Sequence, residues 1–303
     1  MMKMEEFSQA VLGAVKEKLD GAFGAQITTN IKNNGRKLTG ICISRPGSNI
    51  GPCTYLDDGY AAYRRGHMEI HEMAESVWRQ LMEHKDDMKD IRVENFLQWD
   101  RARRRIYPKL VNAGMNREGL KTVPHRPFLD LAVVYYIEVE CAAGDGETAS
   151  ILVQDGHREA WGQEEEGLYQ AAAANMRMDK SPYFKSMGEI FKDMGPDGTN
   201  PFENGGADVK MYVLSNQDRV FGAAEILDRD ILQAVSERLA DDFIVLPSSL
   251  HETVILPSDD APEYTGLANL VREINTFQVA EEERLSDHVY RYGRDTGILE
   301  IVA

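Results

Sequence analysis

Apolar residues near the start of the chain recur with the spacing of one helix face. They are Phe7, Val11, Leu12, Val15 and Leu19, and their spacing is close to the helical period of about 3.6 residues. Charged residues interrupt the apolar positions, so residues 1–19 are predicted to form an amphipathic helix rather than a signal peptide. Strands are predicted next at 26–31 and 37–43, because Asn33-Asn34-Gly35 between them accepts the positive φ angles of a hairpin turn.

A nearly continuous apolar run in the middle of the chain is typical of a strand that is buried on both faces. Residues 127–140 form this run, and 148–154 are predicted to pair with it across a glycine-containing turn. A helix is predicted at 164–176, where Leu168 and Ala172 fall on one face. The middle of the chain therefore predicts two strands followed by a helix.

The last third of the chain repeats this order of elements. Residues 243–247 and 253–257 are predicted to be strands, and 264–277 a helix. The strand–strand–helix units 128–176 and 243–277 are candidates for two related halves, although their residue identity is slight. The order of elements predicts the α+β class, with mostly antiparallel sheets and helices packed on one side of them.

Glycine and proline punctuate the segment between these two parts. Residues 177–208 contain Pro182, Gly188, Gly195, Pro196, Gly198, Pro201, Gly205 and Gly206. Long irregular segments of this kind are usually linkers or functional lids. The sequence therefore predicts a domain at 1–176, a linker or lid at 177–208 and a domain at 209–303, which begins with a hairpin of 209–215 and 220–226.

Charge and composition narrow the choice of partners. The 303 residues include 34 basic and 50 acidic ones, a formal charge of −16, and such a field repels nucleic-acid phosphates and anionic membranes. No run of about 18 apolar residues predicts a membrane helix, and no glycine-rich phosphate loop predicts a nucleotide cofactor. We expect no nucleic acid, no membrane and no cofactor, and the sequence predicts no particular oligomeric state.

Three widely spaced cysteines, Cys42, Cys53 and Cys141, form no Cys-x-x-Cys pair. An odd number of cysteines without such pairs argues against a disulfide framework or a zinc ribbon. We therefore expect reduced thiols, which are the normal state in the cytosol, and a cytoplasmic protein.

The short link between the strands 243–247 and 253–257 carries the strongest candidate chemistry. It contains Ser248, Ser249, His251 and Glu252. A serine nucleophile, a histidine base and a carboxylate that orients the imidazole would make a catalytic set. The Gly-x-Ser-x-Gly pattern of a nucleophile elbow is absent, and serine often bonds backbone groups in a tight turn. Both interpretations stay open.

Other histidines are weaker candidates. His157 and Trp161 would line a pocket, or the tryptophan would pack at a helix start. His288 follows Asp287, and the two would form an acid–base pair, bring a histidine to His251, cap a helix or lie exposed. On an extended strand adjacent side chains point to opposite faces, so the two could not cooperate directly there. His67 and His71 lie four positions apart on a predicted helix, but no third ligand has convincing spacing, so we predict no metal site.

Short motifs follow one another in a fixed order at 124–132, His157, Trp161-Gly162, Leu168-Tyr169, 211–216, 221–224, 246–257 and 285–290. This ordered series resembles an uncharacterised family of Firmicutes proteins defined only as a domain of unknown function. A more distant likeness links the chain to a second uncharacterised bacillar family. The resemblance implies an intracellular bacterial protein with a recurring fold, and it supplies no activity and no functional residues.

Three functions from different classes fit these observations. The leading hypothesis is a cytosolic, non-enzymatic binding or adaptor protein that takes a protein or peptide partner in a groove beside Ser248, Ser249, His251 and Glu252, covered by 177–208. The second is a hydrolase or transferase that uses His251 with Ser248, Ser249 or a carboxylate. The third is an acidic, phage- or host-directed interaction protein.

Overall fold

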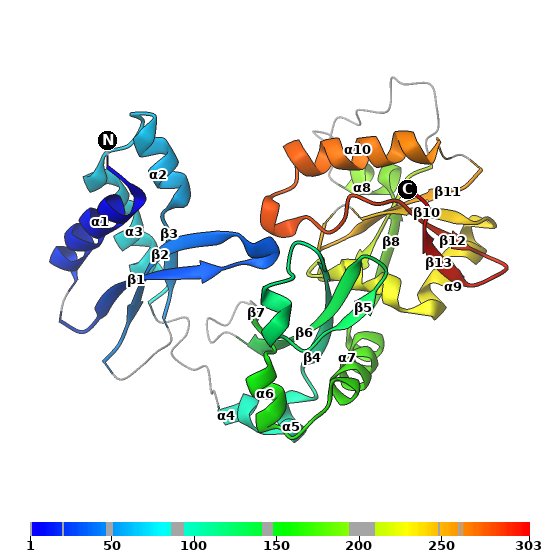
Figure 1. Ribbon diagram of the computed structural model, residues 1–303, viewed down its shortest axis with the longest axis horizontal. Coiled ribbons are helices and arrows are strands. Elements are labelled where there is room, and N and C mark those ends of the chain that lie inside the picture. The colour runs from blue at the N-terminus through cyan, green and yellow to red at the C-terminus, as the bar shows by residue number, and fades with distance from the viewer. Residues whose placement is uncertain are drawn as a thin grey trace. The chain divides into compact units, whose positions relative to one another are not determined.

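The chain folds into two compact units in a computed structural model (Figure 1). The structure describes residues 2–19, 21–46, 51–85, 94–140, 148–193, 210–247, 249–259, 261 and 263–303. The N-terminal unit comprises Met1–Asn95 with Glu138–Ser150, and the C-terminal unit comprises Phe96–Ile137 with Ile151–Ala303.

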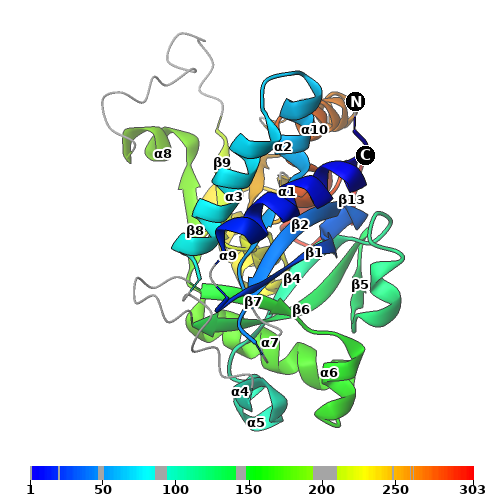
Figure 2. The ribbon, with the colours of Figure 1, turned by 90° about the vertical axis from the view of Figure 1, so that its left-hand side faces the viewer.

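The N-terminal unit is a small antiparallel sheet covered by helices. Its elements are α1 (Met4–Lys18), β1 (Gly24–Ile31), η1 (Asn33–Gly35), β2 (Lys37–Ser44), β3 (Cys53–Tyr55), α2 (Asp57–Arg64) and α3 (Ile70–Glu83), with strand order β1-β2-β3. Helices α1 and α3 lie side by side over the sheet (Figure 2). The predicted hairpin is confirmed, with φ angles of 60° at Asn34 and 71° at Gly35.

A disulfide joins Cys42 of β2 to Cys53 of β3. Ile43 N–H donates to Pro52 O at 3.1 Å, so the two cysteines form a pair without mutual backbone hydrogen bonds, where antiparallel strands approach most closely. Gly40 leaves room for the sulfur, because a Cβ there would lie 2.7 Å from Cys53 Sγ. The expectation of reduced thiols is wrong for this pair, and Cys141 lies outside the described residues.

The C-terminal unit begins with a sheet that packs against α7. Its strands are β4 (Ile106–Asn112), β5 (Arg126–Phe128), β6 (Leu131–Glu140) and β7 (Thr148–Leu152), in the order β4-β6-β5 with β7 on β6. The end of β6 from Glu138 and the start of β7 up to Ser150 belong to the N-terminal unit. Four helices and a 3-10 turn accompany it: α4 (Glu94–Leu97), α5 (Trp99–Ala102), η2 (Gly119–Thr122), α6 (Asp155–Ala160) and α7 (Glu165–Asp179). Leu168 and Ala172 of α7 are fully buried, as their predicted helical spacing requires.

The rest of the C-terminal unit is a six-stranded sheet. Its strands are β8 (Pro182–Ser186), β9 (Tyr212–Asn216), β10 (Phe243–Leu246), β11 (Thr253–Pro257), β12 (Tyr290–Gly293) and β13 (Ile298–Ile301), in the order β13-β12-β10-β11-β9-β8. The connecting elements are α8 (Met187–Asp193), η3 (Gly222–Leu227), α9 (Arg229–Leu239), α10 (Tyr264–Phe277) and η4 (Glu281–Glu283). Each pairing of these strands is antiparallel.

The six-stranded sheet carries helices on both faces (Figure 1). Ile244 packs with α10 on one face, whereas Phe243 and Val245 share a core with α9 on the other. Every residue of β10 is buried, so an uncovered face would expose large apolar side chains to water. The α+β class with antiparallel sheets is confirmed, but the prediction of helices on one side is wrong for this sheet.

The predicted linker is part of the fold where it is described. Within 177–208, β8 pairs with β9 as an edge strand and α8 follows it, while 194–209 lie outside the described residues. Leu168 and Leu214 belong to one hydrophobic core, so the two units differ from the expected division into 1–176 and 209–303. That division, as a statement about independent domains, stays a prediction.

The predicted strand at 220–226 is wrong, because η3 occupies this place. Arg219 and Phe221 have φ angles of 52° and 54°, and this left-handed conformation turns the chain out of the sheet. Gly222 packs so closely on Ser215 and the carbonyl of His251 that no Cβ fits.

Both expected strand–strand–helix units are present, as β6–β7–α7 and β10–β11–α10. Their relation by duplication stays a prediction. Among the described residues, no helix combines the length and the apolar character needed to cross a bilayer.

Candidate functional site

The link between β10 and β11 forms a tight turn that is closed by serine. Ser249 Oγ accepts the N–H of His251 at 3.0 Å, and Ser249 N–H donates to Glu252 O at 3.3 Å. These bonds satisfy backbone groups of the turn, as serine commonly does. Ser248 lies outside the described residues.

The imidazole of His251 is held by backbone and by an aromatic ring. Its Nδ1 accepts the N–H of Phe221 at 3.3 Å, and the two rings stack with centroids 5.5 Å apart. Since Nδ1 accepts, the proton of the neutral ring is on Nε2, which lies 3.8 Å from Glu283 Oε1. In the described part of the chain, the Glu252 side chain makes no hydrogen bond or ion pair, so no serine–histidine–carboxylate chain forms here.

His157 and Trp161 have structural partners of their own. His157 Nδ1 accepts the N–H of Gln154 at 3.1 Å at the start of α6, and its ring stacks on Trp161 at 5.9 Å. Trp161 is buried and donates Nε1–H to Phe96 O at 2.7 Å. Across the described residues, no hydrogen bond or ion pair links His157 or His288 to His251.

The paired histidines His67 and His71 do not share a helix, because α3 begins at Ile70. The prediction that they lie on one helical face is therefore wrong. No group of three or more His, Cys, Asp or Glu side chains within the described ranges has the geometry to hold a metal ion.

His288 belongs to a cluster around a carboxylate that the sequence did not single out as chemistry. Asp130 Oδ2 lies 3.0 Å from His288 Nδ1 and accepts the hydroxyl of Ser286 at 2.6 Å. Asp130 Oδ1 accepts the hydroxyl of Tyr290 at 2.6 Å. We call Asp130, Ser286, His288 and Tyr290 the carboxylate cluster.

The hydrogen bonds of the carboxylate cluster fix the tautomer of His288. The one hydroxyl proton of Ser286 is directed at Asp130, and its oxygen accepts the N–H of His288 at 3.0 Å. His288 Nδ1 therefore faces two acceptor oxygens, Asp130 Oδ2 and Ser286 Oγ, the latter at 3.3 Å. Nδ1 must carry the proton, which leaves the Nε2 lone pair free. The side chain of His288 is 45% exposed.

Asp130 owes its position to the hairpin of β5 and β6. Phe128 pairs with Leu131, so Leu129 and Asp130 form the link, with Leu129 at a φ of 54°. Ala113 N–H donates to Asp130 O at 3.2 Å. The hydroxyls of Ser286 and Tyr290 are both buried, and Asp130 supplies their acceptor.

The segment that carries Ser286 and His288 is anchored from two sides. Asn112 of β4 donates to Leu285 O at 3.0 Å, and Asn275 of α10 donates to Ser286 O at 2.9 Å. Burial, together with the neighbouring Asp130 charge, raises the pKa of Tyr290. Tyr290 thus stays a neutral hydrogen-bond donor to the carboxylate at physiological pH.

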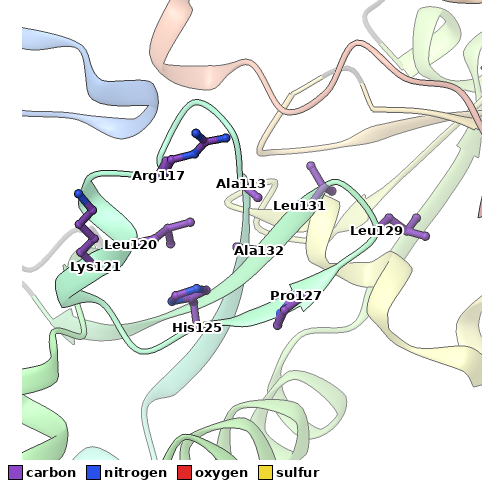
Figure 3. Close-up of a pocket in the computed structure, with 9 residues that line it drawn as sticks. All are labelled: Ala113, Arg117, Leu120, Lys121, His125, Pro127, Leu129, Leu131 and Ala132. Atoms are coloured by element: carbon purple, nitrogen blue, oxygen red, sulfur yellow. The ribbon is translucent and has the colours of Figure 1, made fainter.

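A cavity of about 320 Å³ opens beside the same hairpin (Figure 3). It is lined by Ala113, Arg117, Leu120, Lys121, His125, Pro127, Leu129, Leu131 and Ala132. The two cations come from the segment that follows β4, and the hairpin of β5 and β6 contributes apolar side chains (Figure 3). Leu129 and Leu131 flank Asp130 in the chain, and Ala113 N–H donates to Asp130 O, so the cavity lies at the hairpin link that carries Asp130.

The polar groups of the cavity differ in their existing partners. Lys121 Nζ lies 2.6 Å from Glu118, and His125 Nδ1 lies 2.8 Å from Val123 O. Within the described ranges, the Arg117 guanidinium makes no hydrogen bond or ion pair. Arg117 is thus the cation of the cavity that is left to bind a ligand.

A buried carboxyl in η3 is a further feature that the motif search missed. Glu225 is 1% exposed, and its Oε2 has no hydrogen-bond partner among the described residues. Burial, with a smaller effect of the Asp228 charge, raises the pKa of Glu225 to about 8. Its apolar neighbours in Ala223-Ala224-Glu225-Ile226-Leu227 were a sequence signal for burial.

The sequence also carried a signal for the carboxylate cluster. Ser286, His288 and Tyr290 alternate, and a spacing of two residues places extended side chains on one side of the chain. Asp287 and His288 have different partners: Asn275 donates to Asp287 Oδ1 at 2.8 Å, and the carboxylate beside the His288 imidazole is Asp130. Both stretches, 124–132 and 285–290, were among the motifs of the family resemblance.

Comparisons with known proteins identify the family but no activity. Neither a curated protein nor a solved structure matches the sequence. A family model does match, over residues 4–294, and confirms the resemblance to a family without assigned activity. Because this match covers nearly the whole chain, the protein belongs to the family of unknown function DUF5688.

Proposed function

We propose that the protein binds a small molecule that combines an acidic group with a short apolar body, in the cavity beside β5 and β6. The observation that carries this proposal is Arg117, a guanidinium without a partner in the described residues, at a wall otherwise made largely of Leu, Ala and Pro. An arginine fork binds carboxylate or phosphate through two parallel hydrogen bonds. The apolar wall would hold the rest of the ligand.

Size and charge support the same ligand class. A cavity of about 320 Å³ is at the small end of the range for ligand sites. The formal charge of −16 disfavours anions in general, so an acidic ligand must be attracted locally. Arg117 at the cavity supplies that local positive charge, whereas the charge of Lys121 is offset by Glu118.

The broader expectations from the sequence remain compatible with this proposal. A peptide that ends in a free carboxylate beside an apolar side chain carries the same chemistry as a small acid, so the adaptor hypothesis is one arm of the test. A cytoplasmic location also stays a prediction. The Cys42–Cys53 disulfide argues against it, because stable disulfides are rare in the cytosol.

Calorimetric titration tests the proposal directly. We expect hexanoate to bind and hexanol to bind at least tenfold more weakly, since a charge-assisted hydrogen bond contributes about 1.5–3 kcal/mol. Arg117→Gln should weaken hexanoate binding by a similar factor. Arg104→Gln is the matched control, because Arg104 is an exposed arginine of the same unit that does not line the cavity.

Two further experiments test whether the ligand binds in the cavity and whether it is a small acid or the end of a peptide. Ala113→Leu adds bulk to the cavity wall and should abolish binding. The tripeptide Ala-Ala-Leu with a free C-terminus, compared with its amidated form, tests the peptide source. Equal hexanoate affinity in wild type, Arg117→Gln and Ala113→Leu would overturn the proposed function.

A further inference from the structure

We infer that His288 is the general base of a hydrolytic site that acts on esters of the acidic, apolar ligand class. This inference rests on the proposed function, because the cavity beside β5 and β6 supplies the substrate. The established facts about the family include no activity. Two observations carry the inference: the geometry of the carboxylate cluster, and the position of Asp130 between Leu129 and Leu131, which line the cavity.

The imidazole of His288 has a fixed direction. Asp130 and Ser286 hold the Nδ1–H edge of His288, as the arrangement of donors and acceptors requires. The lone pair on Nε2 therefore points away from the carboxylate, on a side chain that is 45% exposed. A carboxylate bound to Nδ1–H is the arrangement that orients an imidazole as a base and stabilises the imidazolium formed when Nε2 takes a proton.

Ser286 is excluded as the nucleophile. Ser286 is 2% exposed, so a substrate carbonyl has no access to its hydroxyl. Its proton is directed at Asp130 rather than at His288 Nε2. The nucleophile is therefore water, which the exposed Nε2 can reach.

The location of the substrate follows from the cavity. Leu129 and Leu131 line the cavity on either side of Asp130 in the chain, and His288 Nδ1 is 3.0 Å from the Asp130 carboxylate. An acyl chain that places its acid group at Arg117 and runs along the apolar wall leads toward the hairpin link. The structure thus favours an ester whose acyl part carries a second, free carboxylate.

The proposed reaction is the attack of water on the ester carbon, with His288 as the base. His288 Nε2 takes a proton from water while the water oxygen bonds to the ester carbon, whose π electrons move to the carbonyl oxygen. The tetrahedral intermediate then expels the alcohol oxygen, which receives the proton from His288 Nε2–H. A carboxylic acid and an alcohol leave, His288 returns to its neutral form, and Asp130 stays ionised throughout. Asp130 is a positioning residue, because it acts through His288.

The test uses two chromogenic esters on the full-length protein. The mono-4-nitrophenyl ester of glutaric acid carries a free carboxylate, and 4-nitrophenyl butyrate lacks it. We expect faster hydrolysis of the glutarate ester. His288→Gln should lower kcat about 100-fold, the lower range for general-base catalysis. His71→Gln, an exposed histidine of the N-terminal unit, is the control for background imidazole reactivity.

Separate measurements distinguish the roles of His288 as the base, Asp130 as the positioning residue and Arg117 as the binding residue. Arg117→Gln should raise KM for the glutarate ester about tenfold and leave kcat unchanged. The rise of kcat with pH in wild type should disappear in His288→Gln and change its form in Asp130→Asn, which a merely structural role would not produce. Thermal unfolding of each variant shows whether it is folded, and Asp130→Asn provides a second route if His288→Gln unfolds.

The outcomes separate this inference from the proposed function. If His288→Gln and His71→Gln hydrolyse the ester at equal rates and hexanoate still binds, His288 is not the general base. The proposed binding function would then still stand. No hexanoate binding, with hydrolysis that still depends on His288, overturns the cavity as the substrate site. Loss of activity in His288→Gln together with the Arg117→Gln effect on KM supports both.

Discussion

Two Ser-x-His turns in the C-terminal unit have the same local structure and different chemistry. In each, the serine oxygen accepts the histidine N–H at 3.0 Å, Ser249 for His251 and Ser286 for His288. The rings differ in what holds Nδ1: a backbone N–H donates to it in His251, whereas His288 faces the Asp130 carboxylate. The comparison teaches that the partner of Nδ1, rather than the residues adjacent in sequence, decides which nitrogen is free to act.

The C-terminal unit also holds two carboxyls that differ in their hydrogen-bond partners. Phe221, which holds His251, immediately precedes η3 and its buried Glu225, whose Oε2 has no partner in the described residues. Asp130 beside His288 accepts two hydroxyl groups and faces the imidazole. Burial without a partner favours the neutral form of Glu225, whereas the Asp130 carboxylate has three polar neighbours.

The largest effect that we predict concerns Glu225. Its pKa of about 8 in the folded chain lies above the ordinary value of 4.5. The contribution of the neutral Glu225 carboxyl to the free energy of unfolding is therefore fully present below pH 4.5. This contribution is lost as the pH rises to 8. At about 1.4 kcal/mol per pH unit, the loss approaches roughly 5 kcal/mol. Glu225→Gln should remove this part of the pH dependence in urea denaturation at several pH values.

Glu273→Gln, an exposed glutamate on α10, is the control for this prediction and should leave the pH dependence unchanged. Parallel curves for wild type and Glu225→Gln between pH 5 and 9 would mean that the buried carboxyl has a partner or ionises freely. The contrast between the two carboxyls would then fail.

The second effect concerns the carboxylate that holds His288. Asp130→Ala leaves the buried hydroxyls of Ser286 and Tyr290 without their acceptor, and each unsatisfied group costs about 1–3 kcal/mol. We expect a loss of roughly 3 kcal/mol in the free energy of unfolding. Glu283→Ala beside His251 should cost less than about 0.5 kcal/mol, because this pair is exposed and 3.8 Å apart. Equal losses of unfolding free energy in Asp130→Ala and Glu283→Ala would contradict the difference between the two turns.

The third effect separates the two serines. Ser286→Ala removes an acceptor of the His288 N–H and a donor to Asp130, both in a buried place. Ser249→Ala removes only the acceptor of the His251 N–H. We expect losses of about 2 and about 1 kcal/mol in the free energy of unfolding. Urea denaturation measures both, and a larger loss for Ser249→Ala would contradict the assignment.

The local elements of this fold were predictable, and the contacts between distant segments were not. Asn34 and Gly35 identify the first hairpin because few other residues accept positive φ. Phe221 gave no such signal, since an aromatic residue with a φ of 54° is unusual and is held there by packing. The strand predicted at 220–226 failed for this reason.

In the candidate site, too, residues adjacent in sequence were predictable and contacts between distant segments were not. The turn around His251 was predictable because its polar residues are adjacent in sequence. Asp130 and His288 are 158 positions apart, and no periodicity joins them. The alternation of Ser286, His288 and Tyr290 was visible, but their common partner required the folded hairpin of β5 and β6.

The smallest effect that we predict is the absence of a change at His251. The backbone N–H of Phe221 donates to Nδ1 of this ring at 3.3 Å, so the proton of the neutral form stays on Nε2 whether or not Glu283 is charged. In ¹⁵N spectra at a pH where both imidazoles are neutral, His251 should show the Nε2–H tautomer and His288 the Nδ1–H tautomer. Glu283→Gln should leave the His251 signals in place, whereas Asp130→Ala should alter those of His288. A change of tautomer at His251 in Glu283→Gln would mean that a carboxylate orients this ring as well, and the turn of His251 would then have the same chemical capacity as the turn of His288.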